Sequence, residues 1–203
     1  MSAALFAPPI LSDLLCACMH VITITLTHTH THTHTHTHTH THACATVWNN
    51  VYSFDMSAIR SLAMLEPLVD TVQEQALVTE SCKLWTCDIA NVKKEDLTFE
   101  CPFKLRCARR DYIHALVAWF DIEFSHCHKP IHFSTGPRAK YTHWKQTVFY
   151  LNDELTVEQD EELDGLIRCR PNSKNHRDLD IEIAYSFKGA AGEVEAVQPY
   201  RMR

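Results

Sequence analysis

The stretch "DLDIEIAYSF" (178–187) alternates strictly and decides the fold class of this chain. Leu179, Ile181, Ile183, Tyr185 and Phe187 occupy every second position, and polar or small residues fill the positions between them. Successive side chains of a β-strand point to opposite faces of the sheet, so this period of two predicts a strand with one buried face. The pattern is typical of an antiparallel sheet that lies against a core on one side.

Four earlier stretches are also rich in strand-forming residues, namely 68–72, 82–92, 115–124 and 145–151. The turn-forming sequences "GP", "RPNSKN" and "KGAAGE" lie between such stretches or after them. Several short strands separated by turn residues predict an antiparallel sandwich or barrel. We therefore expect a mostly β domain, an antiparallel barrel, over residues 67–203.

The preceding segment, 48–66, reads as one or two short helices that stop before Pro67. Its apolar residues do not alternate strictly, and it holds large side chains for its length: Trp48, Tyr52, Phe54 and Met56. So much apolar area must be buried somewhere. The segment either packs onto its own domain or projects as an arm that packs onto a partner subunit.

Residues 1–47 form a leader of different composition, in which Asp13 is the only charged side chain. Eight histidines alternate with threonine from His28 to His42. In an extended strand these imidazoles would share one face and would bind nickel or zinc in solution. A CA dinucleotide repeat also translates to Thr-His, and we favour this origin. Polar low-complexity sequence does not offset its ordering entropy, so we expect an irregular, disordered leader.

Charge and motifs exclude several classes of protein. A net charge of −6 argues against general nucleic-acid binding, which needs a basic stripe. No glycine-rich run cradles a phosphate, and no run of 18 apolar residues predicts a membrane span. Nine cysteines without a Cys-x-x-Cys pair indicate reduced thiols in a cytosolic or nuclear protein.

The stretch "HCHKPIH" (126–132) gathers four possible zinc ligands, His126, Cys127, His128 and His132. A structural zinc site usually combines two such clusters at fixed spacing. The chain has no second cluster with that spacing. We therefore expect no metal site here.

Long blocks of the chain resemble the protein arginine N-methyltransferases, most closely the type I enzymes that make asymmetric dimethylarginine. The resemblance runs from Trp48 to Arg203, and order, spacing and contiguity all agree. The blocks that carry it are "VYSFDMS" (51–57), "VKKEDLTFECPFKL" (92–105), "RRDYIHALVAWFDIEF" (109–124), "YTHWKQTVFY" (141–150) and "RPNSKNHRDLDIEI" (170–183).

The resemblance implies a β-barrel substrate domain interrupted by a helical dimerisation arm. In the family, the arm of one subunit docks on the cofactor domain of the other and forms a head-to-tail dimer. Residues 48–65 match this arm, with Trp48, Tyr52, Phe54 and Met56 as its large side chains. Ser53 departs from the family, which usually has glycine at this position.

The resemblance also implies a site at Tyr141–Trp144, which matches the family's Thr-His-Trp loop. Together with Tyr141 and Thr142, His143 and Trp144 would reach the active site. His143 would help to position carboxylates around the substrate guanidinium and would serve a proton relay, and Trp144 would wall the arginine channel.

The family uses S-adenosylmethionine, and its catalytic glutamates and cofactor loop lie in a Rossmann-type half that we do not find in these residues. We therefore expect this chain alone to bind no cofactor and to be inactive. By family, its substrates are Arg-rich proteins such as histones and RNA-binding proteins, in the nucleus and cytoplasm. The alternative is a non-catalytic binding module that forms dimers with a full-length family member.

Overall fold

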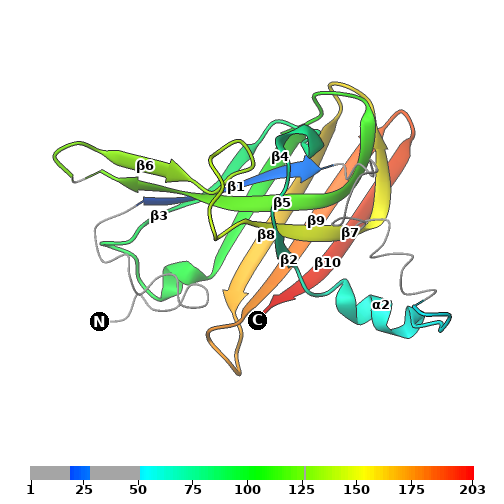
Figure 1. Ribbon diagram of the computed structural model, residues 1–203, viewed down its shortest axis with the longest axis horizontal. Coiled ribbons are helices and arrows are strands. Elements are labelled where there is room, and N and C mark those ends of the chain that lie inside the picture. The colour runs from blue at the N-terminus through cyan, green and yellow to red at the C-terminus, as the bar shows by residue number, and fades with distance from the viewer. Residues whose placement is uncertain (1–18, 28–50, 126) are drawn as a thin grey trace.

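The computed structural model describes residues 19–27, 51–125 and 127–203 and contains two antiparallel sheets (Figure 1). The first sheet has the order β2-β7-β5-β1-β3, with β6 paired to β5, and the second has the order β10-β9-β8-β4. The strands of the first sheet are β1 (Met19–Thr27), β2 (Leu68–Asp70), β3 (Cys82–Asp88), β5 (Asp111–Phe124), β6 (Ile131–Ser134) and β7 (Gln146–Val157). Those of the second are β4 (Phe99–Arg106), β8 (Glu162–Pro171), β9 (Leu179–Gly189) and β10 (Gly192–Met202).

Helical structure in the described part of the chain is limited to three short elements. These are α2 (Ser57–Ala63) and the 3-10 turns η2 (Glu74–Ala76) and η3 (Glu95–Leu97). The prediction of a mostly antiparallel β fold with a short helix before Pro67 is thus confirmed. None of the described helices is long and apolar enough to span a membrane. The six cysteines in the described ranges are all free.

The strictly alternating stretch "DLDIEIAYSF" (178–187) corresponds to β9. Ile181, Ile183, Tyr185 and Phe187 are buried, whereas Ser186 on the other face is exposed. These side chains meet residues of the first sheet such as Phe149 in one apolar cluster. Complete burial of each such group stabilises the fold by roughly 1.5–3 kcal/mol. The core therefore lies between the two sheets.

Three strands of the second sheet were not predicted, namely β4, β8 and β10. Each carries a residue that usually weakens a strand pattern: Pro102 in β4, Gly165 in β8 and Pro199 in β10. Their partners on neighbouring strands compensate, because every residue of β4 pairs with β8 in a continuous register. The tertiary pairing thus overrides the local signal.

The expectation of an irregular leader over residues 1–47 is wrong for Met19–Thr27. This segment forms β1, which lies between β5 and β3 and pairs antiparallel with both. Two facing strand edges offer rows of unpaired backbone N–H and C=O groups, and a segment rich in β-branched residues satisfies them. The Thr-His tract His28–His42 lies outside the described residues, so its disorder and its metal binding stay predictions.

Candidate functional site

A tight turn carries His143 and Trp144 immediately before β7. The backbone N–H of Lys145 donates to the carbonyl of Thr142 at 3.2 Å, which places His143 and Trp144 at the two middle positions. Lys145 then takes a left-handed backbone conformation, with φ of 53°. His143 and Tyr141 are exposed, whereas Trp144 is half-buried. The turn therefore presents the imidazole outward and the indole inward.

Trp144 anchors the turn to the β5–β6 hairpin through aromatic contacts. Its ring stacks on Phe133 of β6, with centroids 5.6 Å apart, and meets Phe120 of β5 edge to face at 5.9 Å. The imidazole of His143 lies 4.0 Å from the indole. Each such aromatic pair adds roughly 0.5–1.5 kcal/mol beyond the area it buries. The anchored ring of Trp144 thus holds the neighbouring His143 in position.

Gln146 holds the other side of the turn. Its side-chain oxygen accepts a hydrogen bond from the backbone N–H of Val72 at 2.7 Å, and its amide nitrogen donates to the carbonyl of Thr135 at 2.6 Å. Next to it, Lys145 Nζ forms an ion pair with Asp70 Oδ1 at 3.1 Å. The start of β7 is therefore tied to the segment after β2 and to the loop after β6.

Two polar atoms of the turn are buried without a hydrogen-bond partner among the described residues, Thr142 Oγ1 and Trp144 Nε1. Buried polar atoms in native proteins nearly always have a partner. The hydrogen-bonding capacity of these two atoms is therefore unused within the described residues.

The second candidate feature is the arm, which consists of a two-residue hairpin at 51–54 followed by α2. Val51 and Phe54 exchange two backbone hydrogen bonds of 2.9 and 3.0 Å, and Tyr52 and Ser53 at the tip both have positive φ. Tyr52 is 93% exposed, Phe54 is 72% exposed and α2 buries no residue. In Figure 1, α2 projects on the side of the molecule opposite to the β5–β6 hairpin. Such an exposed aromatic surface is typical of a protein–protein contact.

The model of one known protein family matches most of this chain. The model of the arginine methyltransferase oligomerization subdomain matches residues 34–190, most of the chain. The chain belongs to the protein arginine N-methyltransferase family. The match begins upstream of Trp48, where the resemblance had been expected to start.

The chain is similar to enzymes that are named protein arginine N-methyltransferase 1. The enzyme of Chlamydomonas reinhardtii is 52% identical over 156 residues, which are 77% of this chain and 45% of the relative. That of Schizosaccharomyces pombe is 52% identical over 158 residues, 76% of this chain and 46% of the relative. The chain thus spans about half the length of the curated relatives it matches.

A solved structure has the same fold and carries a related sequence. It is the Trypanosoma brucei PRMT1 enzyme-prozyme heterotetrameric complex with AdoHcy, with a TM-score of 0.83 and 32% sequence identity. The likeness covers 91% of this chain and 56% of that chain. The oligomerization subdomain and this heterotetramer support oligomer formation in the family.

Of the predicted site residues, the structure places Thr142, His143 and Trp144 in one turn, with Tyr141 immediately before it, and Tyr52, Phe54 and Met56 in the arm. Trp48 lies outside the described residues. The described residues hold no group of three or more His, Cys, Asp or Glu side chains arranged for a metal. His126 also lies outside them, so the prediction of no metal at 126–132 stays untested.

Sequence reasoning missed the residues that hold the turn, above all Phe133, Asp70 and Gln146. Gln146 and Val72 are 74 positions apart, and no local pattern marks such a contact. The available signal was the polar Gln146 at the start of the apolar strand "KQTVFYL". A buried polar side chain needs a hydrogen-bond partner, and this hydrogen bond can hold together two segments that are distant in the sequence.

One prediction concerns the hairpin tip of the arm. Ser53 has φ of 71°, in a region that costs a non-glycine residue about 1–2 kcal/mol. We expect Ser53→Gly to relieve roughly 1 kcal/mol of this strain and to slow amide hydrogen exchange of Phe54 about fivefold, because the Phe54 N–H closes the hairpin. Ser61→Gly in α2 is the control, which should weaken the helix instead. Unchanged exchange at Phe54 would show that the tip is not strained.

Proposed function

We propose that this chain supplies the arm and the substrate-side domain of a type I enzyme that transfers methyl groups from S-adenosylmethionine to arginine in proteins. The observation that carries the proposal is the turn at Tyr141–Trp144, where buried contacts fix Trp144 and leave His143 exposed. A ligand-positioning side chain on a rigid support is what guanidinium alignment requires. Membership of the family and the relatives named above support the same function.

The residues described here do not fit S-adenosylmethionine. The sequence has only four glycines and no glycine-rich cofactor loop, and the groove of about 880 Å³ on the second sheet includes no residue of the turn. When bound in the family, the cofactor supplies the methyl group. In our proposal the cofactor is held by residues outside these 203, and His143 contributes an imidazole that helps to position carboxylates around the substrate guanidinium.

We further propose the family's substrates, Arg-rich proteins such as histones and RNA-binding proteins, and the nucleus and cytoplasm as the place of action. The two sheets would close into the family's barrel.

A second candidate function is a non-catalytic module that pairs with a full-length family member. The observation that favours it is the arm, whose exposed Tyr52 and Phe54 have no cover among the described residues.

A labelled-methyl assay on an Arg-Gly-rich peptide tests these proposals. We expect no turnover by the 203-residue chain alone, because it lacks the glycine-rich cofactor loop. Added to a full-length relative, a pairing chain should change turnover in proportion to its concentration, whereas a chain that does not pair leaves turnover unchanged. Methyl incorporation by the isolated chain would overturn the proposal that the cofactor is held elsewhere.

A further inference from the structure

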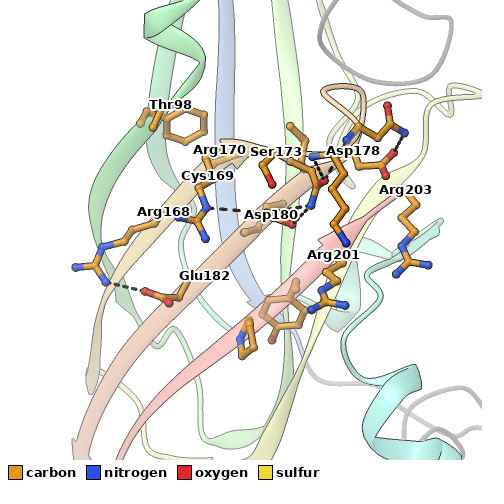
Figure 2. Close-up of a pocket in the computed structure, with 18 of the residues that line it drawn as sticks. Thr98, Arg168, Cys169, Arg170, Ser173, Asp178, Asp180, Glu182, Arg201 and Arg203 are labelled. Atoms are coloured by element: carbon orange, nitrogen blue, oxygen red, sulfur yellow. Dashed lines mark hydrogen bonds and ion pairs between the residues drawn. The ribbon is translucent and has the colours of Figure 1, made fainter.

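A second feature of the molecule is a groove of about 880 Å³ on the second sheet (Figure 2). It lies where β8, β9 and β10 meet the loop 172–178, and neither the Thr142–Lys145 turn nor the arm contributes to its lining. Charged side chains line it from β4, β8, β9, β10, the loop and the last residue of the chain, namely Glu100, Arg168, Arg170, Lys174, Asp178, Asp180, Glu182, Arg201 and Arg203. The volume lies within the range of small-molecule and peptide pockets.

The carboxylates of the groove already have partners. Arg168 donates to Glu100 at 2.9 Å and to Glu182 at 2.7 Å, and these contacts raise the pKa of the guanidinium. Both oxygens of Asp180 accept hydrogen bonds from the side-chain amide of Asn172, at 3.0 and 3.2 Å. Each of these acids therefore already pairs with a group of the protein.

Several cations of the groove are left without a close partner. Arg201 and Lys174 form no ion pair within the described ranges, and Arg170 and Arg203 reach a carboxylate only at 4.0 Å. In the register of β8, β9 and β10, Arg170 and Arg201 flank Asp180 from either side. Neighbouring strands lie about 5 Å apart, so both long side chains can reach one common ligand. Figure 2 shows the guanidinium groups of Arg201 and Arg203 at the same end of the groove.

We propose that this groove binds an oxyanion, carboxylate or phosphate, carried on a short acidic peptide segment. The planar fork of a guanidinium matches two oxygens of such a group, and Lys174 adds a point charge from the loop. Four carboxylates also line the groove, those of Glu100, Asp178, Asp180 and Glu182, and they repel a long polyanion, which favours a short peptide over a nucleic acid. The groove is thus a docking site separate from the turn that carries His143.

Calorimetric titration of the full chain with three matched hexapeptides tests the proposal. The peptides are identical except for phosphoserine, glutamate or serine at one central position, and ionic strength is held constant with sodium chloride. We expect the phosphoserine and glutamate peptides to bind and the serine peptide to bind at least about tenfold more weakly, since a hydrogen bond to a charged group contributes a factor of this order. The tighter of the two anionic peptides identifies the preferred oxyanion. Equal binding of all three peptides, or binding of none, would overturn the proposal.

Variants locate the site. Arg201→Gln and Lys174→Gln should each weaken the preferred peptide about tenfold. Arg110→Gln is the matched control, because it removes the same charge from an exposed pair with Glu158 that does not line the groove. If Arg201→Gln disturbs the circular dichroism spectrum, Lys174→Gln on the loop decides alone. An equal loss in Arg110→Gln would show unspecific charge attraction and contradict the proposal.

Discussion

Gly165→Ala is expected to destabilise the β-domain by about 3 kcal/mol. An added Cβ at Gly165 in β8 would lie 2.3 Å from Cζ of Phe103, closer than any van der Waals contact allows. Phe103 is the cross-strand partner of Gly165 in β4 and is 4% exposed, so its ring has little room to move. Overpacking of a dense core typically costs 1–3 kcal/mol, and this approach is at the severe end.

Denaturant unfolding of the full chain, followed by circular dichroism, measures the loss, and a double-mutant cycle identifies its cause. Phe103→Leu alone should destabilise by creating a cavity, but combined with Gly165→Ala it removes the atoms that clash. The double variant should therefore be more stable than the sum of the single changes predicts, by at least about 1 kcal/mol. Additive losses would mean that the ring of Phe103 is not what excludes a side chain at position 165.

The sheet pattern was predictable where one face of a strand is buried and the other is not. In β9, Ile183 is buried and Ser186 is exposed, and this alternation is visible in the sequence. β8 was missed because Gly165 breaks the pattern, although the ring of Phe103 covers the glycine from the neighbouring strand. A sequence pattern describes only the residues of one strand, whereas much of the stability of a sheet comes from side-chain pairs between neighbouring strands.

The candidate site was also predictable only in part. His143 and Trp144 were predicted through the family resemblance. Composition alone offers no reason to choose His143 among fifteen histidines or Trp144 among four tryptophans. The contacts that position them, from Gln146 to Val72 and from Trp144 to Phe133, join segments that are far apart or separated by a loop. Such contacts follow from topology and have no local signature. The strand β1 was missed for the same reason, because its partners β3 and β5 create the place that it fills.

Loss of the arm's aromatic side chains is expected to weaken pairing with a full-length relative by at least about 100-fold. Tyr52 and Phe54 are exposed by 93% and 72%, and they stand on a rigid two-residue hairpin. Large aromatic side chains of this kind are typical hot spots, each contributing 2 kcal/mol or more to association. We therefore expect the double variant Tyr52→Ala, Phe54→Ala to weaken binding to the full-length Chlamydomonas enzyme at least about 100-fold.

Co-purification and analytical ultracentrifugation of the mixed proteins measure this loss. Tyr112→Ala is the matched control, because Tyr112 is a large exposed aromatic residue on β5, outside the arm. The arm variant should keep the melting temperature of the isolated chain, since neither side chain is buried in it and an exposed substitution changes stability little. Retained pairing in the arm variant, or an equal loss in Tyr112→Ala, would place the partner contact elsewhere on the domain. A selective loss would show that the arm contributes the binding energy while the two sheets serve as its rigid support.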